Sequence, residues 1–153
     1  MKIYLLTHER ELKKPTNTGR IVKECLADNV EIVVWKRTEP ANKIIELIDR
    51  DEIALLYPNN TGNPADNDNK YDNFLILDGT WQEARKMYNL SPYLQKASRV
   101  SLNIVEPSRY KLRRNQKPEG LSTAECAIEL LRLKGLKILA EKIGAEFDLF
   151  NKR

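Results

Sequence analysis

Short apolar runs alternate with amphipathic segments along the chain. The apolar runs, which are typical of buried strands, are residues 2–7, 30–36, 53–58, 74–78 and 98–104. Hydrophobic residues at helical spacing indicate helices at residues 18–27, 40–50, 80–89, 122–135 and 137–150. Most strand candidates are continuously apolar, as in a parallel sheet that helices cover on both faces. The pattern therefore predicts one α/β domain over residues 1–153, with a mostly parallel sheet.

Length and composition are consistent with one compact domain. The chain has 153 residues, of which 41% are hydrophobic, and no apolar run is long enough to span a bilayer. The apolar part of the N-terminus, residues 3–6, is shorter than the core of a signal peptide. Cys25 and Cys126 have neither the spacing of metal ligands nor the density of a disulfide framework. We therefore expect a cytoplasmic protein without a bound metal.

Positive charge is concentrated in one segment. Lys and Arg number 26 and Asp and Glu 22, which gives a net charge of +4. This excess permits a polyanionic partner without identifying one. The stretch SRYKLRRNQK, residues 108–117, contains five basic residues and no acidic one. It is either a solvated surface loop or a segment that contacts RNA phosphates.

Two junctions that lead into helices carry candidate ligand-binding residues. In TNTGR, Thr16, Asn17 and Thr18 can each cap a helix whose first backbone amides attract anions. Gly19 permits close approach of a ligand, and Arg20 offers a forked donor for carboxylate or phosphate. In LSTAE, Ser122 and Glu125 form the S-x-x-E pattern of a capping box. Both junctions are also ordinary helix starts, so their spacing alone leaves both interpretations open.

A third junction, LDGTW, contains residues that a capped helix does not require. Thr80 and Glu83 form the T-x-x-E pattern of a capping box, and Gly79 makes the turn. Asp78 ends an apolar strand, where partial desolvation raises the pKa of a carboxylate and suits it to proton transfer. Trp81 either offers a flat surface to a nucleobase or packs in the core.

Four motifs in the order TNTGR, LDGTWQEARKM, PSRYKLR and LSTAECA resemble the DTW-domain family, whose members are tRNA-uridine aminocarboxypropyltransferases. The Asp-x-Thr-Trp core that names the family corresponds to Asp78, Thr80 and Trp81. The resemblance covers most of the chain and implies a SPOUT-like α/β domain with a C-terminal trefoil knot, an exception to the usual unknotted topology. Because the sequence starts at its first strand, we do not expect the cysteine-rich N-terminal extension of many relatives.

The resemblance also implies a reaction and the residues that carry it. S-adenosylmethionine is the co-substrate, and its 3-amino-3-carboxypropyl group passes to N3 of a uridine in tRNA, which releases methylthioadenosine. Asp78 is the expected base that removes the N3 proton. Trp81 is the second expected catalytic residue, and its ring would form one side of the pocket for adenine or uracil. The residues expected to bind the co-substrate are Thr18, Gly19, Arg20, Leu77, Gly79, Thr80, Leu121, Ser122, Thr123 and Glu125. Those expected to contact the tRNA backbone are Arg109, Lys111, Arg113 and Arg114.

Two alternatives remain open at this point. SPOUT-like domains usually transfer a methyl group, so the chain could be an S-adenosylmethionine-dependent RNA methyltransferase, which would release S-adenosylhomocysteine instead. A non-catalytic RNA-binding module would use the basic segment and keep Asp78 as a structural carboxylate. The sequence fixes neither the tRNA, nor the target uridine, nor the oligomeric state.

Overall fold

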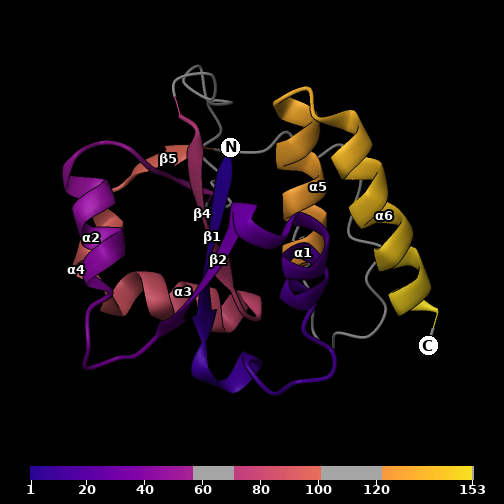
Figure 1. The fold of residues 1–153 in the computed structure, drawn as a ribbon. Coiled ribbons are helices and arrows are strands. Elements are labelled where there is room, and N and C mark those ends of the chain that lie inside the picture. The colour runs from indigo at the N-terminus through magenta and orange to yellow at the C-terminus, as the bar shows by residue number, and fades with distance from the viewer. Residues whose placement is uncertain (57–70, 101–121, 153) are drawn as a thin grey trace.

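A five-stranded parallel sheet forms the centre of the molecule (Figure 1). The computed structural model describes residues 1–56, 71–100 and 122–152. Its strands lie in the order β2-β1-β4-β3-β5, and all four neighbouring pairs are parallel. They are β1 (Lys2–His8), β2 (Val30–Trp35), β3 (Ala54–Leu56), β4 (Asn73–Asp78) and β5 (Ser98–Val100). The α/β class with a parallel sheet is therefore confirmed. The C-terminal knot stays an expectation, because residues 101–121 lie outside the described part.

Helices cover both faces of the sheet (Figure 1). One face carries α1 (Gly19–Leu26), α5 (Thr123–Leu133) and α6 (Lys137–Asn151), and the other carries α2 (Asn42–Asp49), α3 (Trp81–Leu90) and α4 (Pro92–Gln95). Two short 3-10 helices, η1 (Glu9–Glu11) and η2 (Ala27–Asn29), flank α1. The sequence pattern did not predict α4, since four residues are too few to show helical periodicity. None of the described helices is long and apolar enough to cross a membrane.

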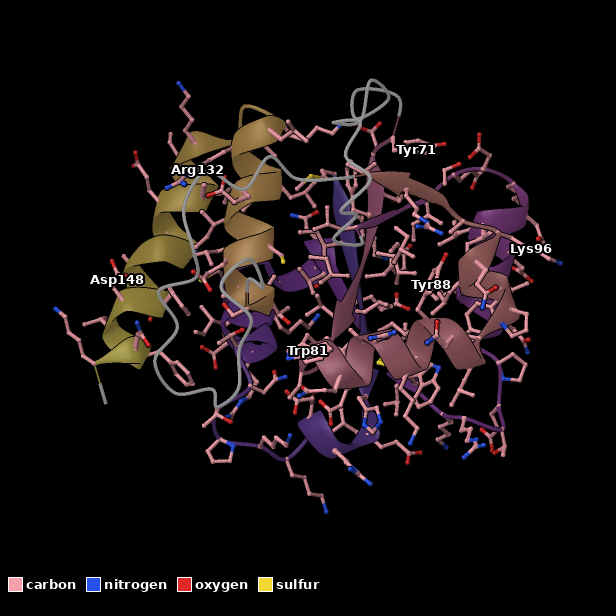
Figure 2. All side chains as sticks on the ribbon, turned by 180° about the vertical axis from the view of Figure 1, so that it is seen from behind. Tyr71, Trp81, Tyr88, Lys96, Arg132 and Asp148 are labelled. Carbon is pink, nitrogen blue, oxygen red and sulfur yellow. The ribbon has the colours of Figure 1, made fainter. Side chains whose placement is uncertain are left out.

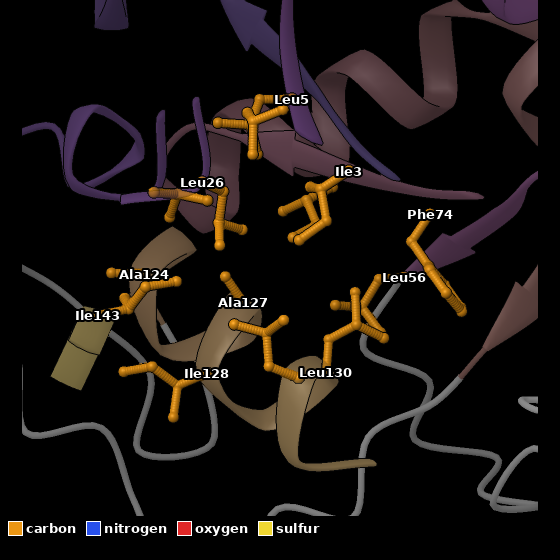
Figure 3. Close-up of a cluster of buried hydrophobic side chains, with 14 of the residues drawn as sticks. Ile3, Leu5, Leu26, Leu56, Phe74, Ala124, Ala127, Ile128, Leu130 and Ile143 are labelled. Atoms are coloured by element: carbon orange, nitrogen blue, oxygen red, sulfur yellow. The ribbon is translucent and has the colours of Figure 1, made fainter. Parts of the chain in front are cut away.

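Two hydrophobic clusters, one on each face, explain the continuous apolar runs. In β1, Ile3 and Leu5 pack with α1, α5 and α6, whereas Tyr4 and Leu6 pack with α2, α3 and α4. Figure 3 shows the first cluster, in which side chains of the sheet face those of α5. Successive strand residues point to opposite faces, so a strand with two covered faces needs apolar residues throughout.

The edge strand β2 departs from the expected continuous burial. Ile32 and Val34 are 39% and 37% exposed, and buried residues stand only at the two ends of the strand. The expectation of a fully covered strand is therefore wrong for β2. Ile32 and Val34 are exposed because β2 lies at the edge of the sheet, where the helices cover it incompletely.

The carboxyl ends of β1 and β4 organise the candidate site. They are neighbours in the middle of the sheet, and Thr7 is paired with Asp78 at their carboxyl ends. After β1 the chain turns to α1 on one face, whereas after β4 it turns to α3 on the opposite face. In open α/β sheets, ligands bind at the carboxyl ends of two neighbouring strands whose following helices lie on opposite faces of the sheet.

Candidate active site

Asp78, at the carboxyl end of β4, is a buried carboxylate held by three side chains. Thr123 Oγ1 donates a hydrogen bond to Oδ1 at 2.7 Å, and Asn17 Nδ2 donates to the same oxygen at 3.0 Å. Thr7 Oγ1 donates to Oδ2 at 3.0 Å. Asp78 is only 2% exposed. Because its donors come from β1, the segment before α1 and the first turn of α5, one carboxylate joins three parts of the chain.

Gly19, the first residue of α1, allows the helix start to lie against this carboxylate. A Cβ atom at position 19 would lie 2.6 Å from Asp78 Oδ2 and 3.0 Å from Asn17 Oδ1. The free amides and the positive end of the helix dipole at such a start stabilise a nearby anion. The sequence indicated that Gly19 permits close approach of a ligand. In the structure the group that approaches is the side chain of Asp78.

The surroundings of Asp78 shift its affinity for a proton. Burial raises the pKa of Asp78 above its ordinary value, because the interior solvates the charged form less well than water does. The hydrogen bonds from Thr123, Asn17 and Thr7 act in the opposite direction without reversing the shift, and the negative charge of Glu11 adds to it. A raised pKa is the direction expected for a carboxylate that ends an apolar strand.

A second buried carboxylate, Glu11 of η1, is connected to Asp78 through Asn17. Asn17 Nδ2 donates to Glu11 Oε1 at 3.4 Å as well as to Asp78, so one amide group bridges the two acids. Lys14 Nζ lies 2.6 Å from Glu11 Oε2 and compensates its charge. Sequence reasoning missed Thr7, Glu11 and Lys14, and it took Asn17 for a helix cap. The available signal was their position at the end of β1 or in the segment between β1 and α1, at the predicted carboxyl edge of the sheet.

Glu83 ties the start of α3 to the segment after β1. Its Oε1 accepts a hydrogen bond from the Thr80 amide at 2.8 Å, and Thr80 Oγ1 accepts one from the Glu83 amide at 3.1 Å. The capping box predicted from T-x-x-E is therefore confirmed. Glu83 Oε2 also lies 3.8 Å from Lys14 Nζ and 3.7 Å from His8 Nδ1. Burial opposes ionisation, but the Thr80 hydrogen bond and these two basic groups outweigh it and lower the pKa of Glu83.

The second capping box starts α5 and is buried. The Ser122 amide donates to Glu125 Oε1 at 3.1 Å, and the Glu125 amide donates to Ser122 Oγ at 3.3 Å. Thr18 adds a contact between helices, because its Oγ1 accepts a hydrogen bond from the Ala124 amide at 3.0 Å. Thr18 thus satisfies a free amide of α5 rather than one of its own helix. The starts of α1 and α5 therefore meet at Asp78.

The remaining predicted site residues lie in different places. Arg20 is turned toward a cavity of about 310 Å³ between α1 and α6, and its guanidinium donates to the Lys14 carbonyl oxygen at 3.0 Å. Leu77 is buried in the cluster beneath α2 and α3, and Gly79 lies against Glu83. Trp81 is half-buried at the start of α3 (Figure 2). The predicted residues outside the described part are Leu121, Arg109, Lys111, Arg113 and Arg114.

Fold and site together define a class: a doubly wound α/β protein with a hydrogen-bonded carboxylate between β1 and β4, where the strand order reverses. The chain belongs to the DTW-domain family, whose sequence model matches residues 1–153. The family resemblance seen in the motifs is thereby confirmed.

Two curated proteins named tRNA-uridine aminocarboxypropyltransferase 2 are similar to this chain. The protein from Drosophila melanogaster is 29% identical over 138 residues, which cover 85% of this chain and 55% of that protein. The protein from Macaca fascicularis is 24% identical over 142 residues, covering 86% and 47% of the two chains. The chain thus spans about half the length of these relatives. No solved structure matches it significantly.

Proposed function

We propose that this chain transfers the 3-amino-3-carboxypropyl group of S-adenosylmethionine to N3 of a uridine in tRNA and releases methylthioadenosine. The observation that carries the proposal is the position of Asp78, the first residue of the Asp-x-Thr-Trp core, at the carboxyl ends of the neighbouring strands β1 and β4. The names of the two relatives support the type of reaction and the RNA substrate.

The residues around Asp78 fit the polar end of the proposed co-substrate. Thr18, Ser122 and Thr123 are buried polar side chains at the starts of α1 and α5. The N-cap side chain, that of Thr18, does not cap the start of α1, so the first amides of this helix are the proposed donors to the carboxylate that the aminocarboxypropyl group carries. When bound, S-adenosylmethionine would supply an electrophilic carbon next to its sulfonium. The proposed co-substrate site also includes Gly19, Gly79, Thr80, Leu121 and Glu125. Arg20, which lines a different cavity, and Leu77, which is buried beneath α2 and α3, are left out of it.

Asp78 is the proposed base. Its Oδ1 accepts two hydrogen bonds and its Oδ2 accepts one, from Thr7, and Gly19 packs against Oδ2. For the N3–H group of uridine to donate to Oδ2, the start of α1 would have to move away from the carboxylate. A positioned base of this kind contributes roughly 10²- to 10⁴-fold to a rate. On the RNA side, Arg109, Lys111, Arg113 and Arg114 remain the proposed backbone contacts of the basic segment.

Incubation with S-adenosylmethionine and unmodified tRNA, followed by nucleoside mass spectrometry, tests the reaction. We expect uridine to gain the mass of an aminocarboxypropyl group and methylthioadenosine to accumulate. A methyl mass gain with S-adenosylhomocysteine would instead identify a methyltransferase. Binding of tRNA without any mass gain across a complete tRNA pool would identify a non-catalytic module.

Asp78→Asn separates the charge of Asp78 from its hydrogen bonds. The asparagine oxygen can accept from Asn17 and Thr123 as Oδ1 does now. Its amide can donate to Thr7 Oγ1, whose own proton can turn to the Leu5 carbonyl oxygen at 3.4 Å. We therefore expect a folded variant that binds S-adenosylmethionine, as measured by equilibrium dialysis, but transfers about 10²- to 10⁴-fold more slowly. Wild-type turnover in this variant would remove Asp78 from the role of base.

A further inference from the structure

The outer face of α3 and a neighbouring turn form a basic groove, here called the α3 groove. Its volume is about 480 Å³. Arg37 contributes from the turn that follows β2, and the residues that α3 contributes include Trp81, Gln82, Arg85, Lys86 and Asn89. Among the described residues that line the groove, none is acidic.

Helical periodicity explains why α3 presents these residues outward. Ala84, Met87 and Tyr88 pack in the hydrophobic cluster on the sheet, so the lining residues fall on the opposite face of the helix. Glu83, the acidic residue of α3, is held by the capping box and lies close to Lys14. The negative charge of α3 is thus directed away from the groove.

The cations of the groove are available to an external anion. Within residues 1–56, 71–100 and 122–152, no carboxylate forms an ion pair with Arg37, Arg85 or Lys86. Glu39, close to Arg37 in sequence, is paired with Lys36 at 3.6 Å. All three cations are exposed. Arginine forks and lysine ammonium groups of this kind bind phosphate.

The groove is next to the candidate active site in sequence. Trp81 lines its first end, and only Gly79 and Thr80 separate Trp81 from Asp78. Figure 2 shows α3 running from Trp81 past Tyr88. The eight-residue step from Trp81 to Asn89 corresponds to a length of about 12 Å along the helix. Single-stranded RNA is commonly bound by an aromatic side chain that stacks on a base, next to cations that follow the backbone.

We propose that the α3 groove is a docking surface for the backbone of tRNA, with Arg37, Arg85 and Lys86 contacting phosphates and Trp81 at the nucleotide nearest the site. The groove is separate in sequence from the basic segment at residues 108–117. Naming tRNA as the RNA rests on the proposed function.

The double variant Arg85→Gln/Lys86→Gln tests this surface. Glutamine removes both charges and has nearly the same helix propensity as Arg and Lys, so the fold should be retained. Each lost phosphate contact lowers the slope of log affinity against log salt concentration by about 0.7 to 0.9. For two contacts, the ratio of the tRNA affinity of the wild type to that of the variant should fall about 7- to 12-fold between roughly 50 and 200 mM salt.

Lys137→Gln/Lys152→Gln is the matched control. It removes the same charge from exposed positions in and directly after α6, on the opposite face of the sheet. Its salt slope should equal that of the wild type. Thermal unfolding of all three proteins establishes that any difference in binding occurs between folded states.

Three results would overturn the docking surface: a salt slope that is unchanged in Arg85→Gln/Lys86→Gln, an equal fall in the control, or a wild type that does not bind tRNA. Binding is measured without S-adenosylmethionine, so the outcome does not depend on the transfer reaction. A wild type that binds tRNA through this groove but adds no aminocarboxypropyl group would contradict the proposed function and leave the docking surface intact.

Discussion

Replacement of Gly19 by alanine should disturb the contact on which the site is built. The new Cβ atom would lie 2.6 Å from Asp78 Oδ2, 3.2 Å from Asp78 Cγ and 3.0 Å from Asn17 Oδ1. A distance of 2.6 Å is too short for two non-bonded atoms, so either the carboxylate or the start of α1 has to move. Because Asp78 is buried and accepts three hydrogen bonds, it cannot turn aside without losing some of them.

The size of the effect follows from two opposing contributions. Overpacking a buried site costs about 1 to 3 kcal/mol. Replacing glycine by alanine at a compatible backbone position stabilises by about 0.4 to 1 kcal/mol, because the unfolded chain loses freedom. The net loss for Gly19→Ala therefore lies between about 0 and 2.6 kcal/mol, with a midpoint near 1.3 kcal/mol. For a domain of this size, the midpoint lowers Tm by about 3 to 5 °C.

Gly144→Ala provides the matched control. Gly144 lies inside α6, and a Cβ atom there would meet nothing within 4 Å. The same chemical change should raise the free energy of unfolding by about 0.5 to 1 kcal/mol, because alanine is the better helix former. The two variants are thus expected to shift Tm in opposite directions, as measured by circular dichroism.

A double-mutant cycle shows whether Asp78 is the cause. In an Asp78→Ala background the carboxylate is gone, so Gly19→Ala should cost less than in the wild type, with a coupling of about 0.5 to 3 kcal/mol. If Gly19→Ala proves as stable as Gly144→Ala, or if its cost is the same in both backgrounds, the close packing of α1 on Asp78 is refuted.

Two further predictions concern the same network. The pKa of Asp78 is higher in the folded state than the ordinary value of 3.8, so the stability that it contributes is present at pH below 3.8 and is lost as the pH rises through the folded-state value. As the pH rises from acidic to neutral, the wild type should therefore lose free energy of unfolding relative to Asp78→Asn, as measured with urea. A difference between the two proteins that is constant with pH would contradict the raised pKa. Asn17→Ala removes the amide that bridges Asp78 and Glu11 and should cost about 1 to 3 kcal/mol, because two buried acceptors lose a shared donor. An unchanged unfolding midpoint in Asn17→Ala would show that the bridge is not formed in solution.

The local features of this fold were predictable from the sequence, whereas the partners of Asp78 were not. Both capping boxes could be read from four-residue patterns, and the predicted strands and helices begin and end within two residues of their expected bounds, except that the expected ends of two strands, residues 58 and 104, lie outside the described residues. Thr7 reaches Asp78 only because the register of β1 on β4 pairs the two residues. Such a register depends on packing between segments about seventy residues apart, and no local pattern encodes it.

Asn17 and Thr18 were misinterpreted because the same polar side chains can hydrogen-bond either to a nearby helix start or to residues far away in the sequence. Asn17 and Thr18 precede α1 and have the polar side chains that commonly cap a helix. In the structure Asn17 donates to Asp78 and Glu11, and Thr18 accepts from an amide that lies 106 residues further along the chain. The sequence thus marked the polar positions correctly but could not reveal their partners. The α3 groove escaped notice for a related reason, since Arg37 joins α3 only in the folded chain.

The position of Asp78 makes a structural and a chemical role compatible. Three hydrogen bonds hold the carboxylate in one orientation, and a base must be held in this way to meet a proton at a fixed distance. Burial raises its pKa and thereby its affinity for that proton. The two roles respond to different changes: Asp78→Ala leaves the donors Thr7, Asn17 and Thr123 without their acceptor and should lower stability, whereas Asp78→Asn can retain these hydrogen bonds and removes only the charge. If both variants are as stable as the wild type and both transfer slowly, Asp78 serves the chemistry and is not needed to hold β1, α1 and α5 together.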